Sequence, residues 1–207
     1  VPKSKYFIKT DKDANFEKDN WAVFFPAGTF YEDFYLDFDV KDNVMTVQND
    51  LTAVHNNFLV TVLDNSTNND EKTFIASVKN GKWSYNNTKR IDNTFSTYTK
   101  KLGEFKVSRD TIAPRVSISK SIEGKWITNQ KAIQLYISDE MSGVNTYNGF
   151  INGNWVLFEY EHKNNKITHY FDDKFLNEGE NDLKVVVTDN VGNSTIFETR
   201  FLRSQKK

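Results

Sequence analysis

Apolar side chains recur at every second position in several short segments of this chain. A period of two is typical of a β-strand that buries one face, and no window of ten or more residues keeps the helical period of 3.6. In the segment 33–40 the alternating residues are Phe34, Leu36, Phe38 and Val40. Similar segments, rich in β-branched and aromatic residues, are 57–63, 73–78, 132–137 and 182–188. The pattern predicts an all-β protein.

Turn residues indicate how these strands are joined. Asn80-Gly81 and Asn152-Gly153 predict two-residue type I′ hairpins, because Asn and Gly adopt positive φ at little cost. The segment 189–193 predicts a longer hairpin loop with Gly192 or Asn193 at positive φ. Asn164-Asn165 is a further candidate turn, which would pair Tyr160 with His169 across its hairpin. Such frequent turns point to sandwiches or barrels.

The length of 207 residues fits two domains. A boundary is expected in the segment 109–114, where Pro114 favours extended backbone just before it. We therefore expect an N-terminal β-sandwich at 1–110 and a C-terminal β-sandwich at 111–207. The linker has a proline but no Gly/Ser run, so it should be short and stiff.

Composition narrows the functional classes. The net charge of −1 at pH 7 gives no long-range field to attract nucleic acid. No stretch approaches the roughly 20 apolar residues of a transmembrane segment. Cysteine is absent, so neither disulfides nor thiol catalysis are available. The N-terminus has no initiating Met and no hydrophobic signal core, and we expect the chain to be a fragment of a longer protein.

Three segments of the second half resemble bacterial immunoglobulin-like modules. They are Asp110-Thr-Ile-Ala-Pro-Arg-Val116, Ser138-Asp-Glu-Met-Ser-Gly-Val144 and Val187-Thr-Asp-Asn-Val-Gly-Asn-Ser194. Together with the following 196–201 they are similar to the C-terminal region of lysostaphin-type zinc metallopeptidases of Bacteroides-group bacteria, and the likeness extends weakly into 26–33 and 102–105. The resemblance implies two tandem immunoglobulin-like β-sandwich domains.

Peptidases of that type cut cross-links in peptidoglycan, with a zinc held by an H-x3-D pair and one His of an H-x-H pair. The histidines of this chain are His55, His162 and His169. His169 begins an H-x3-D string that ends at Asp173, but no H-x-H is present. The resemblance therefore implies a non-catalytic accessory or targeting region, with no cofactor and with the catalytic domain outside this chain. The alternatives are an independent surface module that binds polysaccharide or glycan, and a structural spacer.

Two kinds of side chain are candidates for a site. Asp139 and Asp189 are weak calcium candidates, because acidic and amide oxygens cluster around them, but turns favour the same residues for their own hydrogen bonds. The aromatic candidates for a stacking platform that binds sugar rings or flat peptide segments are Trp83, Trp126, Trp155, Tyr31 and Tyr35. The competing interpretation is that these aromatics are spent on the cores.

These considerations set the expected partners and location. We expect peptidoglycan or a surface glycan as the partner, no nucleic acid, and a monomeric chain. The resemblance implies a secreted, periplasmic or cell-surface location.

The incomplete ligand set gives a first prediction. The isolated chain should hold no stoichiometric zinc and should have no zinc-dependent peptidase activity, because zinc needs three or four converging ligands. Metal analysis of the purified chain and the turbidity of a peptidoglycan suspension test this. Clearing of the suspension that a chelator abolishes would contradict it.

Overall fold

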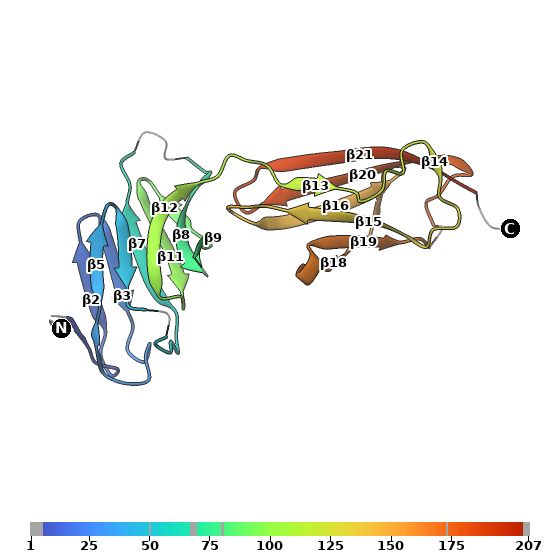
Figure 1. The fold of residues 1–207 in the computed structure, drawn as a ribbon. Coiled ribbons are helices and arrows are strands. Elements are labelled where there is room, and N and C mark those ends of the chain that lie inside the picture. The colour runs from blue at the N-terminus through green and yellow to red at the C-terminus, as the bar shows by residue number, and fades with distance from the viewer. Residues whose placement is uncertain (1–5, 50, 67–69, 80, 173, 205–207) are drawn as a thin grey trace. The chain divides into compact units, whose positions relative to one another are not determined.

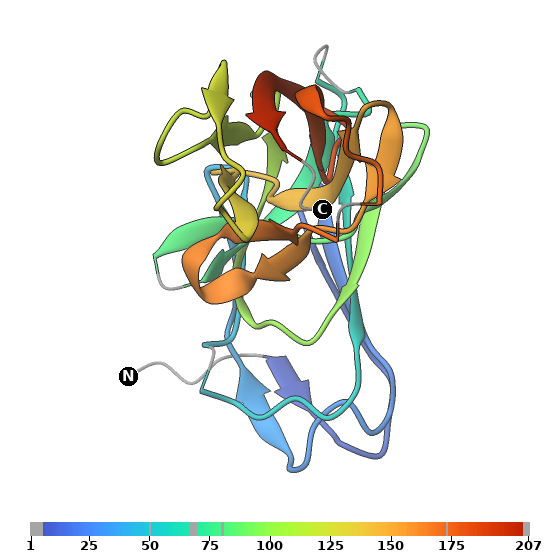
Figure 2. The same cartoon turned by 90° about the vertical axis from the view of Figure 1, so that its right-hand side faces the viewer.

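The computed structural model describes residues 6–49, 51–66, 70–79, 81–172 and 174–204. The chain separates into two units, 1–110 and 111–207. Strands make up nearly all the regular structure of these residues, with one 3₁₀ turn at His162–Asn164 (Figures 1 and 2). None of the helical structure described is long and apolar enough to span a bilayer. The predicted fold class, all-β with tandem immunoglobulin-like sandwiches, is confirmed.

The first unit holds two five-stranded sheets, in the orders β10-β11-β7-β3-β2 and β5-β6-β12-β8-β9, and the pair β1-β4. The pairings within these sheets are antiparallel. The strands are β1 (Tyr6–Ile8), β2 (Ala14–Lys18), β3 (Trp21–Phe25), β4 (Phe34–Leu36), β5 (Phe38–Lys41), β6 (Val44–Val47), β7 (Phe58–Leu63), β8 (Thr73–Lys79), β9 (Lys82–Tyr85), β10 (Lys89–Ile91), β11 (Thr94–Thr99) and β12 (Gly103–Arg109).

The second unit holds a four-stranded sheet, β13-β15-β19-β18, and a five-stranded sheet, β14-β21-β20-β16-β17. In Figure 1, β20 and β21 lie in one layer and β18 and β19 in the other. The pairing of β14 with β21 is parallel. The strands are β13 (Arg115–Ser117), β14 (Lys125–Trp126), β15 (Ala132–Ser138), β16 (Val144–Ile151), β17 (Asn154–Val156), β18 (Glu159–Glu161), β19 (Lys166–Tyr170), β20 (Gly179–Asp189) and β21 (Ser194–Arg203).

Each unit has a hydrophobic core of its own. In the first, both five-stranded sheets contribute fully buried side chains, such as Trp21 and Phe95 from one and Phe105 from the other. In the second, Leu135 belongs to one sheet and Phe201 to the other. Burial of one such side chain contributes about 1.5–3 kcal/mol, so the alternating apolar faces supply most of the stabilisation of each sandwich.

The segment 33–40 differs from the single strand that its alternation predicts. It forms β4 and β5, which belong to different sheets, and the chain changes sheets at Asp37. Gln48 makes this possible, because its N–H donates to the Asp37 carbonyl at 2.6 Å and its Oε1 accepts the Asp37 N–H at 2.8 Å. The alternation still predicted burial correctly, since Leu36, Phe38 and Val40 are buried.

The short hairpins follow their turn residues. Asn152 and Gly153 have φ of 50° and 78°, and Ile151 pairs with Asn154 as a two-residue turn requires. Lys79 pairs with Lys82 around Gly81, while Asn80 lies outside the described residues. In the loop 189–193, Gly192 has φ of 83°, which confirms the prediction of positive φ there.

The hairpin at Asn164-Asn165 has a different register from the predicted one. Tyr160 pairs with Ile167, not with His169. The loop is longer than two residues because a 3₁₀ turn at His162–Asn164 precedes Asn165, which is left-handed with φ of 51°. His162 is consequently exposed, whereas His169 is buried.

The left-handed backbone of Gly192 gives a second prediction. Gly192→Val should destabilise the second unit by about 1–2 kcal/mol, because a β-branched side chain is strained at positive φ. For a unit of this size the melting temperature should fall by roughly 4–16 °C. Gly192→Asn is the matched control and should lose less, since Asn tolerates this region. An unchanged melting temperature for the Val variant would show that the loop can adopt another conformation.

Candidate functional site

The structure separates the aromatic candidates by exposure. Trp126 in β14 and Trp155 in β17 are 60% and 56% exposed. Tyr31 and Tyr35 are exposed as well. Trp83 is half-buried, with the ammonium of Lys106 4.2 Å from its ring centroid. The remaining tryptophan, Trp21, is a buried core residue of the first unit. Exposed aromatics of this size are therefore available in both units.

Trp155 lies in a groove of about 360 Å³ in the second unit, which we call the Trp155 groove. Pockets for small ligands usually measure about 300–1,000 Å³ and are lined by aromatic and apolar groups with a few polar ones. The lining residues are Trp155, Val156, Leu157, Glu159, Thr168, His169, Tyr170, Asp172, Lys174 and Phe175. Trp155, Leu157, Tyr170 and Phe175 are exposed, so this groove presents apolar surface to water.

The groove lies where the chain passes from one sheet to the other. β17 is an edge strand of the five-stranded sheet and β18 is an edge strand of the four-stranded sheet. Leu157 and Phe158 connect them. Phe158 is buried against Gly149, where an added Cβ would lie 2.2 Å from the Phe158 Cε2 atom. Because Phe158 points into the core, Leu157 stands outward beside Trp155.

A buried histidine holds the connection in place. The His169 ring nitrogen Nδ1 lies 2.9 Å from the Leu157 carbonyl oxygen and donates to it. Its ring packs between Phe158 and Phe171, with centroids 5.5 Å from each. The imidazole of β19 thus fixes the backbone of Leu157 from beneath the groove.

An asparagine network holds the other wall, which carries Phe175. The Asn152 amide donates to the Phe175 carbonyl and to the Asn181 Oδ1 atom, both at 2.8 Å. Asn181 is 1% exposed, and its Oδ1 accepts the Asn177 N–H at 2.7 Å. Asn152, in the hairpin that leads to Trp155, therefore also positions Phe175 across the groove.

Polar groups surround the aromatic surface. Glu159, Thr168, Asp172 and Lys174 line the groove and supply both hydrogen-bond acceptors and donors. Next to it, Lys166 and Glu161 form an ion pair of 2.7 Å across the β18–β19 hairpin. The hydrogen bond from Lys166 lowers the pKa of Glu161, and the same bond raises the pKa of Lys166.

Tyr31 and Tyr35 also come together in the first unit. Both line a pocket of about 360 Å³, which we call the Tyr31 pocket. Neither Trp83 nor Trp126 is among the residues that line these two hollows. Trp83 lies in β9 and Trp126 in β14, so neither contributes to the Trp155 groove or the Tyr31 pocket.

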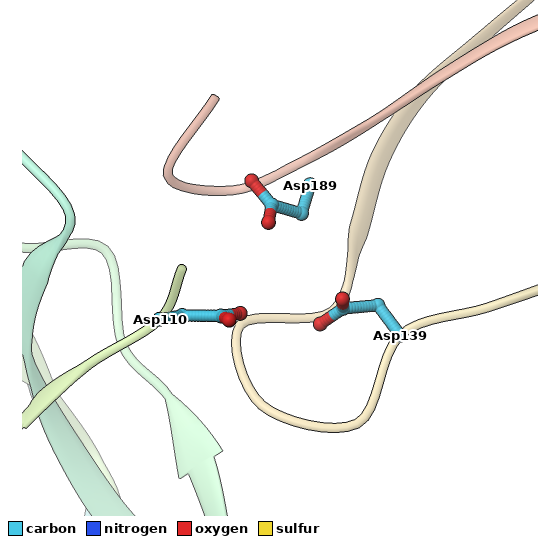
Figure 3. Close-up of side chains that lie close together, drawn as sticks. All are labelled: Asp110, Asp139 and Asp189. Atoms are coloured by element: carbon cyan, nitrogen blue, oxygen red, sulfur yellow. The ribbon is translucent and has the colours of Figure 1, made fainter. Parts of the chain in front are cut away.

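The two calcium candidates lie together with a third carboxylate, as Figure 3 shows. Asp110 directly follows β12, Asp139 directly follows β15, and Asp189 is the last residue of β20. Their carboxylate oxygens lie within 4.8 Å of one another. Asp110 and Asp189 are buried.

These carboxylates already close their own loops. The Asp139 Oδ2 atom accepts the Gly143 N–H at 2.6 Å. The Asp189 carboxylate accepts the N–H of Val191 at 3.0 Å, and the N–H and side-chain amide of Asn193 at 2.8 and 2.7 Å. Such bonds are the turn chemistry that Asp favours. One oxygen from each of the three carboxylates supplies three of the six to eight oxygens that calcium usually takes. Calcium at Asp139 and Asp189, like the expected absence of a cofactor, stays a prediction.

Three exposed members of the Trp155 groove were not predicted from the sequence, namely Leu157, Tyr170 and Phe175. Tyr170 had a usable signal, because it follows the alternation of β19 on the face opposite the buried Ile167 and His169. Leu157 and Phe175 had none, since both lie outside regular strands and their exposure depends on contacts made by Phe158 and Asn152.

Comparisons with known proteins add a family but no activity. The family model described as a Zu5-like domain matches residues 5–110. Among solved structures, the chain is similar to the fibronectin(III)-like modules of CbhA from Clostridium thermocellum, with 8% identity over 72% of this chain and 86% of that one. The TM-score of 0.37 is too low to support a functional comparison. No curated protein matches. None of these comparisons identifies a catalytic family.

The contact between Gly149 and Phe158 gives a third prediction. Gly149→Ala should lower the free energy of unfolding of the second unit by about 1–3 kcal/mol, because the added methyl group overlaps the Phe158 ring. Thermal unfolding measures the effect. Adding Phe158→Leu to that variant should recover part of the loss, since it removes the ring that clashes. If Gly149→Ala alone is neutral, the two residues are not packed as described.

Proposed function

The chain belongs to the Zu5-like domain family, and for this member we propose a non-catalytic, cell-wall-binding function. In this proposal it is an accessory or targeting region of a secreted or envelope peptidoglycan metallopeptidase, and it holds the glycan of peptidoglycan in the Trp155 groove. The proposed location is outside the cytoplasm, where that polymer is found.

The exposed aromatic groove is the observation that carries the proposal. Large apolar groups that face water together, rimmed by polar ones, usually mark a binding surface. Trp155 and Tyr170 are each more than half exposed, and they belong to different sheets. Neither side chain belongs to the hydrophobic core of the second unit, which is filled by other residues.

The chemistry of the groove fits a sugar ring. Aromatic faces can pack against the C–H faces of a pyranose, while its hydroxyl groups need hydrogen-bond partners at the rim. Glu159 and Asp172 provide acceptors, and Lys174 provides a donor. Because Phe158, His169 and Asn152 hold the walls in place, little conformational entropy would be lost on binding.

The placement within a metallopeptidase is supported by the resemblance of the segments that include Asp110, Asp139 and Asp189 to such C-terminal regions. The histidines receive no catalytic role in the proposal. His169 is buried beneath the groove, His162 lies in the 3₁₀ turn and His55 contacts the Tyr31 hydroxyl.

Trp155→Ala tests the proposed function. It should weaken sedimentation with purified peptidoglycan by at least about thirtyfold, because truncation of an aromatic anchor costs about 2 kcal/mol or more. Trp126→Ala is the matched control, since Trp126 is equally exposed but lies outside the groove. Its binding should equal that of the unmodified chain.

Three outcomes would count against the proposal. The unmodified chain could fail to sediment with peptidoglycan, which favours a structural spacer. Both tryptophan variants could lose binding equally, which would place the effect outside the groove. Trp155→Ala could bind normally while its melting temperature is unchanged, which would show that the groove is not the site.

A further inference from the structure

We propose that the Tyr31 pocket of the first unit is a second binding site for a pyranose ring, so that the chain carries two glycan sites. The ligand class rests on the proposed function, because it is inferred from the chemistry that this pocket shares with the Trp155 groove. The site itself rests on the residues of the first unit.

The walls of the pocket are apolar side chains that the core does not use. Tyr31 is 69% exposed and Leu51 is 88% exposed, although burial of either would be favourable. Tyr35 stands beside them and packs against Phe7 at 4.9 Å between ring centroids. Phe30 closes the pocket toward the core and is 4% exposed. An apolar ligand face would remove the exposed groups from water.

The pocket is held rigid by hydrogen bonds around it. Gln48 has φ of 50°, a conformation that is rare for residues other than glycine. Its side chain accepts the Asp37 N–H and donates to the Thr52 hydroxyl at 3.3 Å. The Tyr31 hydroxyl lies 2.9 Å from the His55 Nδ1 atom. Strained residues that their surroundings hold in place are frequent at ligand sites, where they preorganise the walls.

The two hollows share size, composition and position in the fold. Each measures about 360 Å³ and combines exposed aromatic rings and one exposed leucine with a threonine and a glutamate. Each also lies beside a place where the chain changes sheets. The Tyr31 pocket includes Gln48, which bonds to the crossing residue Asp37, and the Trp155 groove includes Leu157, which follows β17. The exposed rings and the carboxylate that make the Trp155 groove suitable for a pyranose are therefore present in the Tyr31 pocket as well.

Polar groups of the Tyr31 pocket complete the match to a sugar. The Glu32 carboxylate can accept hydrogen bonds from ring hydroxyls. The Thr52 hydroxyl can both donate and accept. Glu32 is exposed, so it can meet a ligand without the cost of burying a charge in the free protein.

Isothermal titration of the full chain tests the second site. The probe is the N-acetylglucosaminyl-N-acetylmuramyl disaccharide released from purified peptidoglycan, and the readout is the number of sites. The unmodified chain should bind two molecules. Tyr31→Ser with Leu51→Ser should reduce this to one, as should Trp155→Ala, and the combination of all three should abolish binding.

The controls separate loss of a site from loss of the fold. Tyr98→Ser is matched to Tyr31, because Tyr98 is also 69% exposed in the first unit but does not line the pocket. It should keep two sites. Leu51→Ser alone removes a side chain that lies almost wholly in water, so it should weaken the first-unit site without a change in melting temperature.

Each of the other possible titration results contradicts one of the two proposed sites or both. One site in the unmodified chain that Trp155→Ala removes would overturn the second site and leave the proposed function intact. One site that only the Tyr31 and Leu51 changes remove would overturn the groove and support the Tyr31 pocket. No binding by the unmodified chain would overturn both.

Discussion

The second unit depends on one close contact, the packing of Phe158 on the bare backbone of Gly149. The chain must leave the five-stranded sheet after β17 and enter the four-stranded sheet at β18. Phe158 anchors this crossing in the core, and only a residue without a Cβ leaves room for its ring. Because Phe158 points inward, Leu157 and Glu159 point outward on either side of it. The groove is a consequence of how the two sheets are joined.

The first unit solves the same problem with hydrogen bonds. Its chain changes sheets at Asp37, and Gln48 satisfies both backbone groups of that residue from a left-handed conformation. In both units the alternation of inward and outward side chains continues through the crossing, while the partner strand changes. Outward side chains at a crossing therefore stand around a hollow instead of lying on a continuous sheet face. This accounts for Trp155 and Leu157 at the groove and for Tyr35 at the Tyr31 pocket, whereas Tyr31 and Leu51 come from loops.

The residues on which the resemblance to bacterial immunoglobulin-like modules rests differ from the residues on which the proposed function rests. Asp139 and Asp189 close two loops, and the Asn190 amide joins these loops through the Ser142 carbonyl at 2.8 Å. The aromatic residues of the groove contribute little to the core, and they supply the surface that a ligand can use.

The sequence by itself determined the all-β class, the strands at 57–63, 73–78, 132–137 and 182–188, and the left-handed turn residues, because these follow from a period of two and from local backbone preferences. It also named Trp155, Tyr31 and Tyr35 as candidates. Only the tertiary structure decided that the segment 33–40 is two strands, that His169 is buried while His162 is exposed, and that Tyr170 and Phe175 join Trp155. The physical reason is that alternation states which side chains share a face of a strand, whereas the partner of each strand, and so the exposure of each aromatic, is set by contacts between residues far apart in the chain, such as Gly149 with Phe158 and Asn152 with Phe175.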